Sequence, residues 1–337
     1  MTFDFRLIEP WVALFPGQGS QTIGMGRDFY DAGGPLREVF EEANGIAGKD
    51  IAKLCFRGPI SKLSNTDNLQ IAMTAMNLGV YAEFRAAGWP APALTLGHSV
   101  GEYSALAVAG VISRTAALQA TLQRGLLMQR EAKKFAGAMY AVKKSTAEII
   151  EGLIQELALG EQVIIGNDNG PGQQVISGAA DAVRVLVNRL MADGVECVKL
   201  SVSGAWHSPL MNGCQAEFAA YLAEISFDEP EIPVITNLIA DFATEPERMR
   251  ADLARHLTGK VLWQDSMRRA LTSGYEKFVE IGSGRVLTRL SSKIAESEGR
   301  TIFATGVESA ADLNSFADVL VSEAQVDDRR KFTVDRI

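Results

Sequence analysis

The chain has 337 residues, of which 47% are hydrophobic and 22% are charged. This balance is typical of a folded globular protein, and the length exceeds the roughly 250–300 residues over which a single core usually grows. The net charge of −8 at pH 7 argues against nucleic acid as a partner, because phosphate binding needs a basic surface.

The sequence also argues against export, membrane insertion and metal binding. Residues 1–10 mix acidic, basic and apolar residues, unlike a signal peptide, and no uncharged apolar run approaches the ~18 residues that span a bilayer. The three cysteines, Cys55, Cys197 and Cys214, are far apart and odd in number, which suits neither a disulfide framework nor a zinc site. We therefore expect a cytoplasmic protein without membrane contact or metal.

The first predicted elements are two short apolar strands, at residues 11–15 and 93–96, each of which runs into a glycine-containing loop. A helix is predicted at 101–108 directly after the second loop. Leucines at helical spacing predict another helix at 114–131, with Ser113 as its N-cap.

The middle of the chain follows a different pattern. Its predicted elements are a strand at 139–142, a helix at 145–159, strands at 162–166 and 174–177, a helix at 180–192 and a strand at 195–202. The order β-α-β-β-α-β is that of a ferredoxin-like unit. The chain then continues with a helix at 215–224, a strand at 233–236, helices at 246–257 and 266–273, and a strand at 277–280.

Gly97-His98-Ser99-Val100-Gly101 matches the G-x-S-x-G pattern and stands between a predicted strand and a predicted helix. In this context the pattern indicates a sharp turn that projects a nucleophilic serine, with glycines where side chains would clash. The backbone N–H of Val100, at the helix N-terminus, can then stabilise an oxyanion. A plain turn remains the alternative.

A nucleophilic serine needs a base, and the chain has only three histidines, His98, His207 and His256. The ring of His98 cannot easily reach the hydroxyl of its neighbour within the turn. His207 lies in a loop between a predicted strand and a predicted helix, which suits a base that comes from another part of the fold. A buried or capping histidine is the alternative, and no acid clearly pairs with His207, so the sequence predicts a dyad.

Five segments in order resemble the malonyl-CoA:acyl-carrier-protein acyltransferases, a family that includes free-standing enzymes of polyketide synthesis. They are residues 15–21 (FPGQGSQ), 97–103 (GHSVGEY), 123–129 (QRGLLMQ), 167–178 (NDNGPGQQVISG) and 204–211 (GAWHSPLM). The order and spacing hold over roughly residues 11–307. This resemblance implies that malonyl-CoA acylates a serine, and that the malonyl group then passes to the phosphopantetheine thiol of an acyl carrier protein, without a cofactor.

The resemblance also assigns roles to residues. Ser99 is the nucleophile and His207 the general base, Gln18 and Val100 supply oxyanion-hole N–H groups, and Arg124 pairs with the malonyl carboxylate. Further residues at the substrate site are His98, Trp206, Asn167, Asn169 and His256. The base is oriented by a backbone carbonyl at the position of His256, and the family's proline after Gly259 is replaced by Lys260.

Two of these side chains also make chemical sense for malonyl. The planar guanidinium of Arg124 suits a carboxylate in an enclosed pocket, although an isolated helical arginine is usually a surface residue. Trp206 stands where the malonyl-selective pattern has Phe, and a bulky ring there would fill the space of an α-methyl branch.

We expect an α/β-hydrolase-like large domain (residues 1–131 and 204–325), an inserted ferredoxin-like (βαββαβ) subdomain (132–203) and a charged tail (326–337), with the site in the cleft between them. The expected function is malonyl transfer to a carrier protein, for fatty-acid or polyketide synthesis. An acyl hydrolase and a non-catalytic docking subunit are the alternatives. Carrier proteins of such families are acidic, so Arg285, Arg289 and Lys293 are candidate docking residues.

Overall fold

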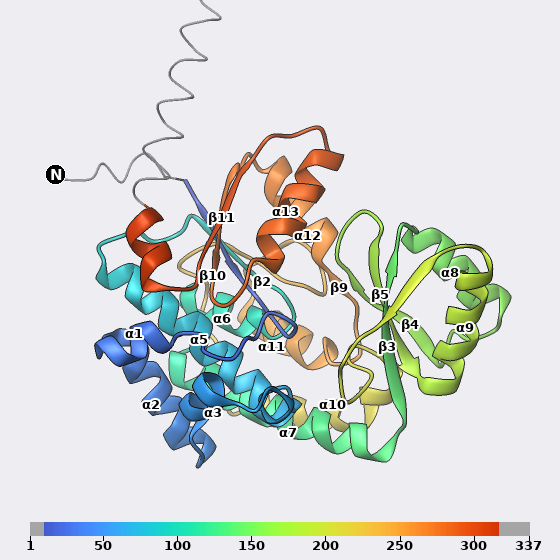
Figure 1. The fold of residues 1–337 in the computed structure, drawn as a ribbon, viewed down its shortest axis with the longest axis horizontal. Helices are drawn as coiled ribbons and strands as arrows, with labels where there is room; N and C mark the ends of the chain where they lie inside the picture. Colours follow the sequence, from blue (N-terminus) through green and yellow to red (C-terminus); the bar gives the residue numbers. More distant parts are fainter. Residues whose placement is uncertain (1–9, 317–337) are drawn as a thin grey trace, which may run out of the picture.

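The computed structural model describes residues 10–316, which form a mixed α/β fold with two β-sheets (Figure 1). The larger sheet has the strand order β11-β10-β1-β2-β7-β8, and its pairings are parallel except that of β7 with β8. Its strands are β1 (Val12–Phe15), β2 (Leu94–Gly97), β7 (Val234–Ile235), β8 (Phe242–Ala243), β10 (Lys277–Ile281) and β11 (Phe303–Val307). The sequence predicts four of these strands, and neither β8 nor β11.

Helices cover both faces of this sheet. They are α1 (Arg27–Ala32), α2 (Pro35–Ala47), α3 (Ile51–Arg57), α4 (Ile60–Leu63), α5 (Thr66–Ala86), α6 (Gly101–Val108), α7 (Arg114–Lys134), α10 (Asn212–Leu222), α11 (Pro246–Arg255), α12 (Trp263–Thr272) and α13 (Val286–Ser297), with a 3₁₀ turn, η2 (Pro209–Met211). The start of α7 is as predicted, because the Ser113 side chain accepts a hydrogen bond from Ala116 N at 3.1 Å. The sequence predicts none of α1–α5.

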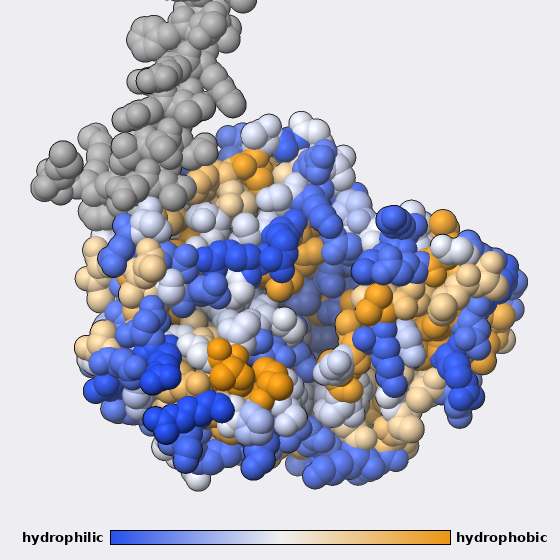
Figure 2. Space-filling view, in the orientation of Figure 1, coloured by the Kyte–Doolittle hydropathy of each residue, from blue (hydrophilic) through white to orange (hydrophobic). Residues whose placement is uncertain are grey.

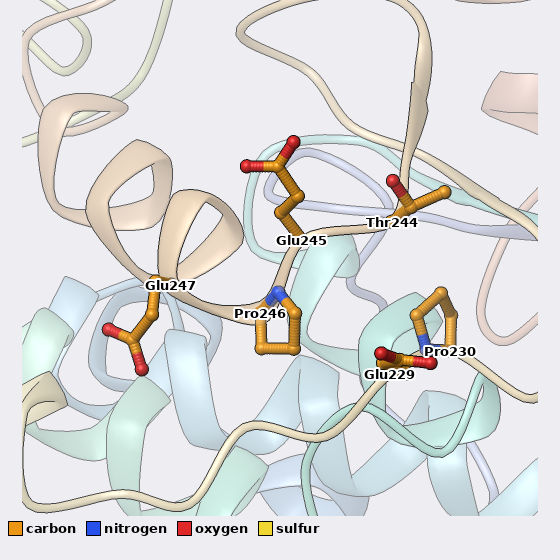
Figure 3. A pocket seen from close by; sticks show the side chains of 6 residues that line it. All are labelled: Glu229, Pro230, Thr244, Glu245, Pro246 and Glu247. Atoms are coloured by element: carbon orange, nitrogen blue, oxygen red, sulfur yellow. The ribbon is translucent and has the colours of Figure 1, made fainter.

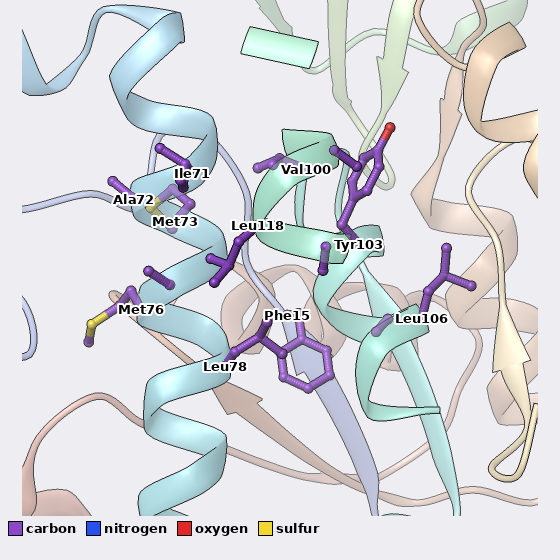
Figure 4. Packing of buried hydrophobic residues seen from close by; sticks show 14 of the residues in the cluster. Phe15, Ile71, Ala72, Met73, Met76, Leu78, Val100, Tyr103, Leu106 and Leu118 are labelled. Carbon is purple, nitrogen blue, oxygen red and sulfur yellow. The ribbon is translucent and has the colours of Figure 1, made fainter. Parts of the chain in front are cut away.

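The alternation of side chains along β1 explains its wholly apolar sequence. Val12 and Leu14 are buried in one cluster with residues of α12 and α13. Ala13 and Phe15 are buried on the other face, in the main core with α5, α6 and α7, and Figure 4 shows Phe15 packed among residues of these helices. A parallel sheet that is covered on both faces needs apolar residues at every strand position.

The smaller sheet has the order β6-β3-β5-β4-β9 and forms a second part of the molecule, to the right in Figure 1. Four of its strands and both its helices follow one another in the chain: β3 (Gly137–Lys143), α8 (Ala147–Glu156), β4 (Val163–Asp168), β5 (Gln173–Ala179), α9 (Ala180–Ala192) and β6 (Glu196–Lys199). Each of these four strands pairs with its neighbour in antiparallel orientation. The fifth, β9 (Val261–Leu262), comes from the later part of the chain and pairs in parallel with β4.

The two parts are joined closely. The predicted boundary at 131/132 falls inside α7, which runs to Lys134, and β9 extends the small sheet with a strand from outside the predicted insertion. The molecular surface is hollowed between the two parts (Figure 2). Within residues 10–316 no helix is long and apolar enough to cross a membrane. The predicted tail at 326–337 lies outside the described residues.

Candidate active site

The turn at residues 97–101 between β2 and α6, called the elbow below, holds Ser99 in a left-handed backbone conformation, with φ of 52°. Both flanking glycines are needed for this turn. A Cβ at Gly97 would lie 2.1 Å from the carbonyl carbon of Gly101, and a Cβ at Gly101 would lie 2.0 Å from the carbonyl oxygen of Phe15. A non-glycine residue with positive φ is uncommon and often marks a functional site.

The hydroxyl of Ser99 meets the imidazole of His207, with 2.7 Å between Oγ and Nε2. His207 also has a positive φ, of 56°, in the loop that precedes η2. Two serine hydroxyls hold this loop: Ser177 donates to Trp206 O at 2.6 Å, and Ser208 donates to Ala205 O at 2.7 Å. Residues that are far apart in the chain are thus brought together in one hydroxyl–imidazole hydrogen bond, as the predicted dyad requires.

The surroundings of His207 determine which ring nitrogen carries the proton. Nδ1 lies 2.8 Å from His256 O and 3.1 Å from Gly259 O. Carbonyl oxygens only accept hydrogen bonds, so Nδ1 is the donor and Nε2 is left as an acceptor for the Ser99 hydroxyl. Burial, followed by the positive charge of Arg124, lowers the pKa of His207 to about 3. The ring is therefore neutral at physiological pH, as a general base must be.

The resemblance predicts that the backbone N–H groups of Gln18 and Val100 bind an oxyanion. Among the described residues neither has a hydrogen-bond acceptor. The loop of Gln18 is held against α5, since Asn77 Nδ2 of α5 donates to Pro16 O at 2.9 Å. A Cβ at Gly17 would lie 2.4 Å from His98 O, so the two loops touch.

Arg124 of α7 is buried, with 1% of its surface exposed. Its Nη2 lies 3.4 Å from Ser99 Oγ, and its Nη1 donates to Gln70 Oε1 of α5. No carboxylate among residues 10–316 lies within ion-pair distance of the guanidinium, and burial lowers the pKa of Arg124. A buried charge normally needs a partner of opposite sign, so this arrangement can bind an anion beside the Ser99 hydroxyl.

The other predicted site residues lie on the elbow, on β4 and the loop after it, and directly before His207. His98 Nε2 donates to Asn169 Oδ1 at 2.7 Å, across from the elbow to the loop between β4 and β5. Asn167 is buried in β4, where it pairs with Val261 of β9. The indole of Trp206 is buried against Gly204, where a Cβ would lie 2.6 Å from its ring, and its Nε1 has no partner within the described structure.

The ring of His256 makes contacts of its own, separate from the hydrogen bond between its carbonyl oxygen and His207. It packs against the ring of His207 at a centroid distance of 4.6 Å with the planes tilted by 41°, and its Nδ1 lies 3.4 Å from Glu102 Oε2. Burial lowers the pKa of His256 and raises the pKa of Glu102 to about 8. Both groups are therefore held in their uncharged forms beneath the dyad.

Sequence reasoning assigned no role to several residues that support the site: Gln70, Glu102, Asn237 and Gly259. Gln70 orients the guanidinium of Arg124, and Gly259 contributes only its carbonyl, for which the sequence carries no signal. Asn237 was detectable in principle, because it directly follows the predicted strand at 233–236. Polar residues at the carboxyl ends of parallel strands commonly belong to a site.

No group of three or more His, Cys, Asp or Glu side chains within the described part of the chain is arranged to hold a metal ion. A separate pocket is lined by Glu229, Pro230, Thr244, Glu245, Pro246 and Glu247 (Figure 3). It shares no residue with the dyad. Its three carboxylates and its lack of a lining cation make it unsuitable for the phosphates of CoA.

Comparison with known proteins agrees with this geometry. Malonyl CoA-acyl carrier protein transacylase of Escherichia coli K12 is 35% identical over 285 residues, which are 84% of this chain and 92% of that protein. The structure of an acyl carrier protein S-malonyltransferase from Vibrio cholerae superposes with a TM-score of 0.86 at 35% identity, covering 91% of this chain and 100% of the other.

A second solved structure is the complex of the malonyl-transacylase PlMCAT with AntF, a type II PKS acyl-carrier protein. It superposes with a TM-score of 0.87 at 34% identity and covers 92% of this chain and 99% of the other. The family model described as "Acyl transferase domain" matches residues 12–316. The chain therefore belongs to the acyl transferase domain family.

Proposed function

We propose that this chain is a malonyl-CoA:acyl carrier protein S-malonyltransferase in which Ser99 carries the malonyl group between the two thiols. The observation that carries the proposal is the buried guanidinium of Arg124, 3.4 Å from Ser99 Oγ and without a carboxylate partner among the described residues. A malonyl group attached to Ser99 would supply the missing carboxylate. The relatives named for malonyl transfer, one of them in complex with a carrier protein, support the same substrates.

In the first half-reaction Ser99 Oγ attacks the thioester carbonyl of malonyl-CoA while His207 Nε2 takes the hydroxyl proton. The oxyanion receives hydrogen bonds from the N–H groups of Gln18 and Val100. The intermediate collapses with loss of the CoA sulfur, which takes the proton from His207. The products are free CoA and malonyl-Ser99.

In the second half-reaction the phosphopantetheine thiol of the carrier protein gives its proton to His207 and attacks the ester carbonyl. The same N–H groups stabilise the second oxyanion. Ser99 Oγ leaves and recovers its proton from His207, so the enzyme returns to its starting state. The dyad, the two N–H groups and Arg124 account for every proton and charge, and we propose that no cofactor or metal takes part.

The acyl hydrolase remains the alternative within enzymes. An unsubstituted acyl chain has no carboxylate and would leave Arg124 buried and unpaired at the site, which is costly. The non-catalytic docking subunit is disfavoured because it gives no reason to keep the 2.7 Å Ser99–His207 hydrogen bond or the strained φ of both residues.

We further propose the finer description of the fold. The parallel large sheet with its elbow between β2 and α6 supports an α/β-hydrolase-like domain (1–131 and 204–325). The antiparallel order β6-β3-β5-β4 supports a ferredoxin-like subdomain at 132–203. A cytoplasmic location is proposed because three free thiols, those of Cys55, Cys197 and Cys214, suit a reducing compartment.

The release of CoA from malonyl-CoA, with and without a holo acyl carrier protein, tests the function. A transferase releases one equivalent of CoA rapidly and then continues only when the carrier protein is added. Continuous release without the carrier protein would identify a hydrolase. No release at all, with Ser99→Ala as the matched control, would identify a docking subunit.

A further inference from the structure

Asn237 lies just after β7, at the carboxyl edge of the large sheet and next to the elbow. It is buried, with 1% of its surface exposed, and every one of its polar groups is used. Its side chain binds the backbone on both sides of the nucleophile: Oδ1 accepts from Ser99 N at 2.7 Å, and Nδ2 donates to Gly97 O at 2.5 Å. The amide thus holds the peptide groups that fix the turn.

The backbone of Asn237 connects two other parts of the site. Its N–H donates to Glu102 Oε2 at 3.3 Å, and its carbonyl accepts from Leu262 N at 3.0 Å. Leu262 belongs to β9, directly after the loop in which Gly259 O accepts from His207 Nδ1. One residue therefore joins the loop of the nucleophile to the loop that orients the base.

The backbone conformation of Ser99 makes its hydrogen bond to Asn237 Oδ1 important for the geometry of the site. A left-handed φ is unfavourable for a residue with a side chain, and the N–H of Ser99 would have no acceptor without Asn237 Oδ1. The direction of Ser99 Oγ and the direction of the next N–H, that of Val100, both depend on this peptide. A small rotation would move both the nucleophile and an oxyanion donor, and such misplacement is costly to rate.

We propose that Asn237 is a positioning residue for acyl transfer, which holds the strained turn so that Ser99 Oγ and the Val100 N–H converge on the same carbonyl. This inference rests on the proposed function. An amide suits this position at every pH, because the side chain must accept from Ser99 N and donate to Gly97 O at once, and an Asn or Gln amide combines both groups on one carbon without depending on a titrating proton.

The decisive variant is Asn237→Asp, which keeps the shape of the side chain. At pH 8 its carboxylate still accepts from Ser99 N but repels Gly97 O, so the turn loses one of its two restraints. When the carboxyl is protonated, it again has one donor and one acceptor and reproduces the amide. Glu102 is the ionisable group in direct contact with this position, and Arg124, Asp252 and His256 are the ionisable groups that act in turn on Glu102.

The experiment measures the single-turnover rate of Ser99 acylation, with KM, for malonyl-CoA and acetyl-CoA between pH 5 and 8. For Asn237→Asp we expect a rate about 10- to 100-fold below native at pH 8, equally for both substrates, with KM changed less than about threefold. The rate should recover toward the native value at pH 5. A purely structural role would not produce this reversal, because the variant is compared at each pH with the native protein, in which Glu102 titrates as well.

Asn68→Asp is the matched control, because Asn68 is also buried and donates to a backbone carbonyl, Lys62 O, at 2.8 Å. It should acylate at the native rate at both pH values. If Asn237→Asp does not fold, Asn237→Ser, which keeps one hydrogen-bonding group, should show an intermediate loss. A native acylation rate in a folded Asn237 variant at pH 8 would overturn the inference. Failure of the native protein to form a malonyl adduct would instead overturn the proposed function.

Discussion

Replacement of Arg124 by alanine should separate malonyl from acetyl transfer. The guanidinium is buried, its Nη1 is already bound to Gln70, and its Nη2 lies 3.4 Å from Ser99 Oγ, where the acyl group is attached. Loss of one partner from such a buried ion pair costs about 2–4 kcal/mol, most of it from the charge left unpaired. Acetyl has no carboxylate, so it should be spared or improved.

The expected result is a shift of roughly 10²-fold in the ratio of kcat/KM for malonyl-CoA to kcat/KM for acetyl-CoA, since each 1.4 kcal/mol is tenfold. Both constants are measured by CoA release in the presence of a carrier protein, for the native protein and for Arg124→Ala. Arg124→Lys is the intermediate control, because it keeps the charge but not the planar fork. An unchanged ratio would mean that Arg124 is structural and would refute the malonyl assignment.

Three further predictions follow from the charges around the dyad and on α13. Because the pKa of His207 is about 3, the base stays unprotonated on acidification, and acylation rates should remain flat from pH 8 to pH 5; a fall centred near pH 6.5 would contradict this. Glu102 keeps its proton in the fold up to about pH 8 but ionises near 4.5 when unfolded, so its contribution to stability is lost as pH rises between these values. The free energy of unfolding of Glu102→Gln, measured by chemical denaturation, should therefore rise relative to that of the native protein between pH 5 and pH 8, by at most about 1.4 kcal/mol per pH unit. A difference between the two proteins that does not depend on pH would argue against the raised pKa. Charge reversal at the exposed Arg289 and Lys293 should slow transfer to the carrier protein while sparing acylation by CoA, whereas equal losses in both steps would reject the docking role.

The structure removes Arg285 from this charge-reversal test of carrier-protein docking. Arg285 was predicted to dock the carrier protein together with Arg289 and Lys293. Its guanidinium instead lies 2.9 Å from Asp312 and 3.5 Å from Glu308. Reversal of Arg285 would break these ion pairs, so its effect would not report on docking.

Features with a local sequence signature could be predicted. The elbow is one, because Gly97 is required by a backbone contact within the motif, with Gly101, although Gly101 is itself required by a contact with the distant Phe15. The N-cap of α7 and the order of strands and helices along the small unit could also be predicted, because both follow from patterns within short stretches of sequence. The predicted fold omits β9, which joins the small sheet across about a hundred residues of sequence, and β8, whose two residues have no period to detect. It also omits the local elements β11 and α1–α5; α5 is buried over most of its residues, so no polar face marks it as a helix.

The supporting contacts of the site were harder to predict for a related reason. His207 is oriented by the carbonyls of His256 and Gly259, and every residue has a carbonyl, so side-chain identity gives no signal. The part played by Asn237 depends on four hydrogen bonds to residues about 25 to 140 positions away. Such contacts become visible only once the chain is folded.

Intact-mass measurement of the protein after mixing with malonyl-CoA tests the central claim most directly. We expect the native protein to gain one malonyl group, with the adduct on Ser99, and to lose it on addition of a holo carrier protein. Methylmalonyl-CoA, opposed by the bulk of Trp206, and acetyl-CoA, which lacks the carboxylate, should give less adduct. The Ser99→Ala protein should gain none. A malonyl adduct that persists on Ser99→Ala would contradict the account.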